Sequence, residues 1–145
     1  MHGRGSEAGG VSLSWFRIAV IYFVLAVGLG VLMGARGDFS LVSVHAHMNL
    51  LGWEALALMG LIYHFVPGLG ANKVARTHFW LHNIGLPVMM LALVMKEQGN
   101  PAAEPILGVA STVVGAAVLL FALNVLFNIG GRRADRQLKS AAMGS

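Results

Sequence analysis

The sequence predicts an all-α integral membrane protein, a four-helix bundle that forms a single transmembrane domain over residues 1–145. Two observations support this prediction. First, 57% of the residues are hydrophobic and only 11% are charged, whereas an ordinary soluble domain has roughly 25% charged residues. The mean hydropathy is +0.72. Second, four apolar stretches are each long enough, at ~1.5 Å per residue, to cross a ~30 Å hydrocarbon core. They lie near residues 14–34, 41–66, 76–95 and 105–129.

Each predicted helix has a local justification. The first has an apolar region from Ile18 to Met33, which is longer than the apolar region of a typical cleavable signal peptide. The second follows Asp38 and Ser40, either of which can cap its first turn. The third and fourth are bounded by short segments rich in Gly, Pro, Asn or charge. The connections, residues 35–40, 67–75 and 96–104, leave no room for a soluble domain.

The basic residues are distributed unevenly between the two ends of the predicted helices. Lys and Arg accumulate on the cytoplasmic side of membrane proteins, so we expect both termini to be cytoplasmic. The net charge of +4 then reflects topology and contact with anionic lipid, and not nucleic-acid binding. Eight basic residues lie on the predicted inner side, Arg4, Arg17, Lys73, Arg76, Arg132, Arg133, Arg136 and Lys139, against Arg36 and Lys96 on the outer side.

The second predicted helix contains unusual polar residues in the run VHAHMNLLGWEALALMGLIYHFVP, residues 44–67. An ionisable residue within a span is costly, so its presence indicates either a function or a hydrogen bond between helices. His45 and His47 lie near the outer end, and His64 lies roughly 28 Å further along the axis. His78 and His82 begin the third helix on the same inner side. We therefore expect an outer pair of histidines and a possible inner cluster of His64, His78 and His82.

His45 and His47 cannot serve the same ligand. Two residues on an α-helix are separated by about 200°, so these imidazoles point in nearly opposite directions. On a regular helix Glu54 shares the face of His47, while Gly52 leaves a gap on the face of His45. A planar cofactor on each side of the helix fits this pattern. The absence of cysteine excludes thiolate ligands, disulfides and cysteine-attached haem.

The run H45-A-H47, L51-G52-W53, G60, Y63, P67 resembles the tenth helix of the catalytic subunit (subunit I) of cbb-type haem-copper oxidases. H78-F79-W80-L81 is similar to the start of that family's next helix. The resemblance implies non-covalent haem b, with His45 on the high-spin haem and His47 on the low-spin haem. It also implies that four residues surround these ligands: Asn49, Gly52, Trp53 and Glu54.

The resemblance leaves the iron coordination incomplete. The family's copper ligands, its cross-linked tyrosine and the histidine opposite the low-spin haem belong to helices that have no match here. We therefore expect an oxidase-like protein but not a self-contained oxygen reductase, and whether it is an enzyme stays open. A sixth ligand can come from a histidine of a second copy, from a methionine, or from nowhere, which leaves the iron open to a gas. The methionines at suitable depth are Met33, Met89 and Met90.

The expected function is electron transfer or binding of a small gas such as O2 or NO by a homo-oligomer, with a dimer favoured, in the bacterial cytoplasmic membrane. The main alternative is a haem-free subunit or assembly partner of a respiratory complex. Metal-ion transport is weaker, since Cys is absent and the methionines are scattered. His64 and His82 can form a second metal or haem site, a proton path or interfacial hydrogen bonds. For His78 we expect packing.

Overall fold

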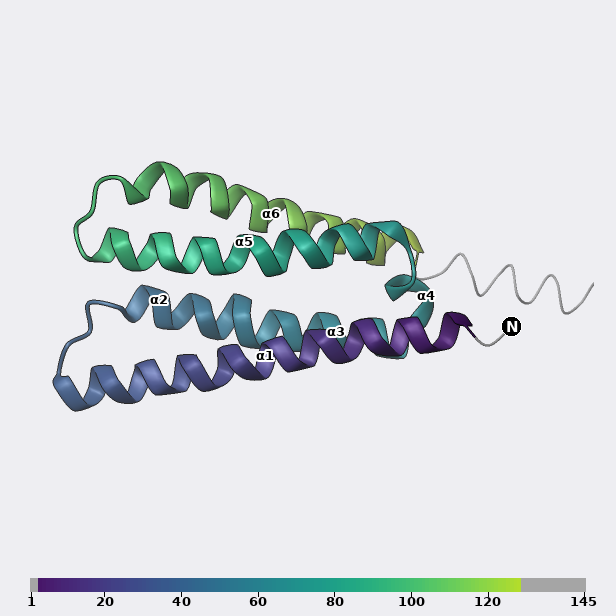
Figure 1. The fold of residues 1–145 in the computed structure, drawn as a ribbon, viewed down its shortest axis with the longest axis horizontal. Coiled ribbons are helices and arrows are strands. Elements are labelled where there is room, and N and C mark those ends of the chain that lie inside the picture. The colour runs from purple at the N-terminus through teal and green to yellow at the C-terminus, as the bar shows by residue number, and fades with distance from the viewer. Residues whose placement is uncertain (1–2, 129–145) are drawn as a thin grey trace, which may run out of the picture.

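The computed structural model describes residues 3–128, and these residues are helical throughout apart from short connections. The helices form two antiparallel hairpins that lie against each other (Figure 1). The first hairpin pairs α1 with α2, η1 and α3, and the second pairs α5 with α6. The elements are α1 (Gly3–Arg36), α2 (Val42–His47), η1 (Met48–Glu54), α3 (Ala55–Phe65), α4 (Pro67–Gly70), α5 (Lys73–Glu97) and α6 (Ala103–Asn128).

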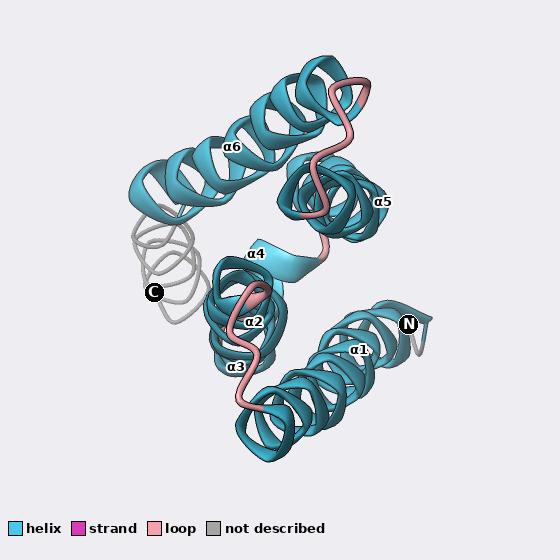
Figure 2. Ribbon diagram, turned by 90° about the vertical axis from the view of Figure 1, so that its left-hand side faces the viewer, coloured by secondary structure: helices cyan, strands magenta, loops and turns pink. Residues whose placement is uncertain are grey.

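The end view in Figure 2 gives the order of the helices across the molecule: α1, then α2 and α3, then α5, then α6. The two hairpin loops lie at one end of the molecule, and α4 lies at the other end (Figure 1). His45 and His47 are therefore near the end with the hairpin loops, and His64 and His78 are near the α4 end. This separation agrees with the two depths expected from the sequence.

Three helical segments are long and apolar enough to cross a membrane: Leu13–Arg36, Lys73–Glu97 and Ala103–Asn128. They indicate a membrane protein. The second predicted span is helical from Val42 to Phe65 but is not one regular α-helix, because the π-helix η1 interrupts it. The expectation of a regular α-helix over residues 41–66 was therefore wrong.

The helix boundaries differ from the prediction where side chains bind the backbone. Asp38 and Ser40 do not cap α2. Instead Asp38 Oδ1 accepts a hydrogen bond of 2.9 Å from the backbone N–H of Ser40, which lowers the pKa of this exposed carboxyl group. The helix α5 begins at Lys73, three residues earlier than predicted, because Asn72 Oδ1 accepts from the N–H of Ala75 and caps the first turn.

The fourth predicted helix appears as α6, two residues earlier at its start. Its predicted end at residue 129 and the basic residues of the C-terminal tail lie outside the described residues.

The buried side chains form two clusters. One lies toward α4 and contains Trp15, Ala19, Leu56, Met59, Tyr63, Leu69 and Ala75. The other lies toward the hairpin loops and contains Val44, Leu86, Met89, Met90, Leu93, Ala110 and Val114. Large apolar side chains on the outer faces of the helices are exposed, such as Val24 at 62% and Leu91 at 67%. Lipid tails cover such surfaces at no cost, as expected for membrane helices.

Two glycines let α1 approach the helix that contains the motif. A Cβ atom at Gly52 would lie 2.5 Å from the Cδ1 and Cγ atoms of Tyr22, and one at Gly30 would lie 2.8 Å from Cε1 of His45. Real Cβ atoms do not approach other atoms so closely, so both positions require glycine. Small residues at helix contacts are typical of membrane proteins, where close packing replaces the hydrophobic effect between helices.

We predict that Gly52→Ala destabilises the fold by about 1–3 kcal/mol, the usual cost of overpacking a well-filled contact. The added methyl group must displace the Tyr22 ring, which α1 holds in place. The measurement is thermal unfolding in detergent. Gly28→Ala is the matched control, because a Cβ atom at Gly28 meets nothing within 4 Å. Equal melting temperatures for the two variants would contradict this packing.

Candidate functional site

Both ring nitrogens of His45 have partners, one on α1 and one on η1. Its Nδ1–H donates to the carbonyl of Ala26 over 2.9 Å. Its Nε2 accepts from the amide of Asn49 over 3.3 Å, and the same amide donates to the His45 carbonyl over 2.9 Å. The ring also lies against Gly30. The side chain therefore has a complete set of partners within the protein.

His47 has a different environment. Its Nδ1–H donates to the carbonyl of Ser43, one turn earlier in the same helix, over 2.8 Å. Its Nε2 has no hydrogen-bond partner among residues 3–128, and the side chain is only partly buried. Histidines that bind metals usually donate one ring N–H to a carbonyl or carboxylate and bind the metal through the other nitrogen. His47 has this geometry, and His45 does not.

The π-helix changes where Glu54 lies. Hydrogen bonds in a π-helix reach from residue i to i+5, so each residue turns by less than in an α-helix. Exposed residues then recur at every fourth position, at Ala46, Leu50, Glu54 and Leu58. The structure thus places Glu54 on an exposed stripe beside His47 and not on the same face. Glu54 therefore presents a carboxyl group on the outside of an apolar helix.

The expected gap at Gly52 is filled by α1. Tyr22 lies against Gly52, and the ring of Trp53 packs on Phe23 with centroids 4.7 Å apart. Asn49, the remaining residue expected around the ligands, bonds to His45. The side of the motif helix that faces α1 is therefore a packed contact between helices, with no space beside His45 for a flat cofactor.

The three candidate methionines are buried. Met33, Met89 and Met90 each have 7% of their surface exposed. Met89 and Met90 pack with Val44 of α2 in the cluster near the hairpin loops. Their environment is apolar packing, which is the usual role of methionine in a core.

The structure separates the expected inner cluster into two parts. His64 is exposed, and its ring contacts only the neighbouring Phe65 ring at 5.5 Å. His78 and His82 are fully buried on α5, and their ring centroids are 5.8 Å apart. His64 therefore does not join the other two.

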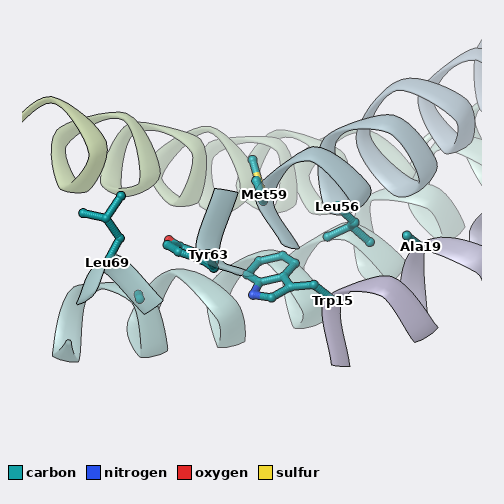
Figure 3. Close-up of a cluster of buried hydrophobic side chains, with 7 residues drawn as sticks. Trp15, Ala19, Leu56, Met59, Tyr63 and Leu69 are labelled. Carbon is teal, nitrogen blue, oxygen red and sulfur yellow. The ribbon is translucent and has the colours of Figure 1, made fainter. Parts of the chain in front are cut away.

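His78 and His82 lie under Trp15 of α1. The indole stacks on the His78 ring at 4.8 Å and meets the His82 ring edge-on at 6.0 Å. Tyr63 lies next to Trp15, as Figure 3 shows, and its hydroxyl is 3.0 Å from Nδ1 of His78. This stacking was not predicted from the sequence. The pattern of residues along one helix does not predict a stacking partner on another helix that is distant in the sequence.

His82 also contacts the π-helix. Its Nε2–H donates to the carbonyl of Leu51 over 3.2 Å. Because η1 departs from the i to i+4 bonding of an α-helix, a backbone carbonyl there can accept from a neighbouring side chain. This bond links α5 to the centre of the histidine motif, and it was not predicted from the sequence.

Within residues 3–128 no three or more His, Cys, Asp or Glu side chains gather as a metal-binding group. The apolar groove between α5 and α6, about 580 Å³, is lined by side chains such as Ile84 and Val109 that offer no ligand. A haem iron needs only one or two axial ligands from the protein. His47 is therefore the described side chain best placed to provide one.

Comparison with known proteins supports a distant relationship to cytochrome oxidases. No family model and no solved structure matches the chain. An alignment over 47 residues, which covers 28% of this chain, is 38% identical to the cbb3-type cytochrome c oxidase subunit CcoN1 of Stutzerimonas stutzeri. The match covers 10% of that protein's length. The similarity indicates a membrane protein of respiratory type, distantly related to the oxidase subunit.

We predict that His45 and His47 differ in stability when the protein is prepared without haem. His45→Ala removes the bonds to Ala26 and Asn49 and should cost about 1–3 kcal/mol, since it leaves buried groups unpaired. His47→Ala should change stability by less than about 0.5 kcal/mol, as is usual away from such features. Thermal unfolding of the two haem-free variants measures both effects. Equal losses would show that His47 is also a packing residue.

Proposed function

We propose that the protein is a membrane haem b protein of the bacterial cytoplasmic membrane that transfers electrons or binds a small gas such as O2 or NO. The observation that supports this proposal is the geometry of His47. Its Nδ1–H is fixed by the Ser43 carbonyl, and its Nε2 is left unpaired on a partly exposed face. The partial similarity to an oxidase subunit supports the same class of function.

The residues fit a haem on the side of His47 and not on the side of His45. A bound haem iron supplies one-electron transfer or gas binding. The protein's part is to hold the iron through Nε2 of His47, with the Ser43 carbonyl fixing the tautomer and orientation of the ring. The neighbouring exposed side chains Leu50 and Leu58 offer an apolar surface to the porphyrin. His45 remains a structural contact to α1.

The second axial ligand is proposed to be His47 of a second copy. His45 uses both ring nitrogens within its own chain, and the candidate methionines are buried in packing. A twofold dimer repeats the same contact from both sides, so one haem between two His47 side chains has two equal ligands. The exposed carboxyl group of Glu54 on the adjacent stripe also favours a partner surface here.

In the membrane we propose that α2, η1 and α3 together form a fourth span, with both termini in the cytoplasm. The 24 residues from Val42 to Phe65 are helical throughout, which is long enough to cross a bilayer at ~1.5 Å per residue. This topology places His45 and His47 toward the outer side.

We predict that tags at either terminus are accessible only from the cytoplasm. The basic residues near the termini and the α4 loop outnumber those at the hairpin loops, and such residues stay inside. Protease or thiol-reagent labelling of tagged protein in intact cells and in inverted vesicles measures the topology. Labelling of the C-terminal tail from outside would place His47 toward the cytoplasm and contradict the proposal.

We predict about one haem per two chains and a low-spin spectrum that carbon monoxide changes little, because two histidines saturate the iron. His47→Ala should abolish haem retention and weaken the dimer in detergent, since a ligand bound only by the dimer stabilises it. His45→Ala should lower the haem stoichiometry or convert the spectrum to high spin, by loosening α1. Haem content, absorption spectra and mass in detergent measure these effects.

His64→Ala is the matched control, because His64 is exposed near the opposite end of the helix and should leave the haem intact. Full low-spin haem in the His47→Ala protein would overturn the assignment. One haem per chain with ready carbon monoxide binding would instead indicate a five-coordinate, gas-binding iron.

A haem-free assembly partner of a respiratory complex is the second candidate. The observation that favours it is the complete pairing of His45 without any cofactor. In that case the exposed stripe with Glu54 contacts another subunit. If protein purified from haem-replete cells shows no Soret absorption, the result would support this second function.

A further inference from the structure

The neighbouring rings of Trp15, His78 and His82 carry buried polar atoms that have no partner among the described residues. Each of the three residues is 0% exposed. Trp15 Nε1, His78 Nε2 and His82 Nδ1 have no hydrogen-bond partner among the described residues. Buried polar atoms in proteins are nearly always paired, with protein or with ordered water. Three unpaired atoms within one set of touching rings require a common explanation.

The hydrogen-bonding character of the three atoms follows from their neighbours. His82 Nε2 must hold the proton, because the Leu51 carbonyl can only accept, and Nδ1 of the neutral ring is then a bare acceptor. In the arrangement that we take for this cluster, the Tyr63 hydroxyl donates to His78 Nδ1, and the neutral His78 ring then holds its proton on Nε2. The indole Nε1–H of Trp15 can only donate. The cluster therefore offers two donors and one acceptor.

We propose that Trp15, His78 and His82 form a binding site for one buried water molecule. The water oxygen accepts from Trp15 Nε1–H and His78 Nε2–H, and one of its hydrogens is donated to His82 Nδ1. Buried waters typically make two to four hydrogen bonds to groups that lack other partners, and three are available here. A metal ion fits less well, because the indole N–H cannot ligate a metal. A haem does not fit, because Trp15 covers the imidazole rings.

The water completes a hydrogen-bonded chain across three helices. It runs from Tyr63 on α3 to His78 on α5, through the water to His82, and from His82 to the Leu51 carbonyl in η1. The indole of Trp15 attaches α1 to the same point. The site therefore fixes the π-helix relative to α5 whether or not haem is bound. The proposal does not depend on the haem assignment.

The test uses full-length protein, labelled with ¹⁵N in histidine and tryptophan, in lipid nanodiscs without haem. We expect His82 to be protonated on Nε2 only and His78 on Nε2 only. Water-edited NMR should show transfer from water protons to Trp15 Nε1–H and to His78 Nε2–H. A missing transfer to both groups in the wild-type protein would overturn the proposal. So would a scalar coupling between His78 Nε2 and His82 Nδ1, which would show a direct bond between the rings.

Two variants distinguish a defined water site from general access of solvent to the three rings. His82→Leu removes the acceptor that the three rings offer to the water hydrogen, and the transfer to Trp15 Nε1–H should be lost. Tyr63→Phe leaves all three water partners in place, and this transfer should persist. Persistence of the transfer in the His82→Leu protein would mean that solvent reaches the cluster without a defined site, and would also overturn the proposal.

Discussion

Polar side chains in an apolar environment must find partners inside the protein, and in this chain the partner is repeatedly a backbone carbonyl. Where the bond crosses to another helix, it holds the fold: His45 attaches α2 to Ala26 of α1, and His82 attaches α5 to Leu51 of η1. Where the bond returns to its own helix, as for His47, it fixes the orientation of the ring but does not join two helices. The same kind of bond thus distinguishes His45 and His82, which join helices, from His47, which is the ligand in the proposed function.

The π-helix η1 contacts both α1 and α5. A π segment inside an α-helix is rare and often marks a functional site, and η1 covers the centre of the histidine motif. Two contacts and one exposed side chain distinguish it. Tyr22 fills the space beside Gly52, His82 binds the Leu51 carbonyl, and Glu54 turns onto the exposed stripe. The wider turn rotates the second half of the helix relative to the first, so the orientation of His47 depends on contacts made by α1 and α5.

The helices could be predicted from sequence because apolar length and polar connections are local signals. The start of α5 also depends on a local signal, the Asn72 cap three residues before Ala75, and the prediction missed it. The two glycine contacts depend on residues distant in the chain. The π-helix could not be predicted, and spacing on a regular helix therefore placed Glu54 with His47. The position of each histidine along the helix axis could be predicted, but the direction in which its side chain points could not. His64 and His78 lie near the same end, yet His64 is exposed and His78 is stacked under Trp15.

The position of α1 limits what the motif can do. The resemblance to the oxidase subunit implies one haem on each side of the helix, through His45 and His47. Here Gly30 and Ala26 of α1 occupy the side of His45 at contact distance, so a porphyrin on that side would have to displace a helix. His47 is partly buried, and its ring has no hydrogen bond to another helix among the described residues. The haem that we propose would therefore lie on the side of His47. The neighbouring stripe exposes the carboxyl group of Glu54 within an apolar helix, which a lipid tail covers poorly, so the proposed second copy of this chain would cover this stripe and also supply the second axial ligand.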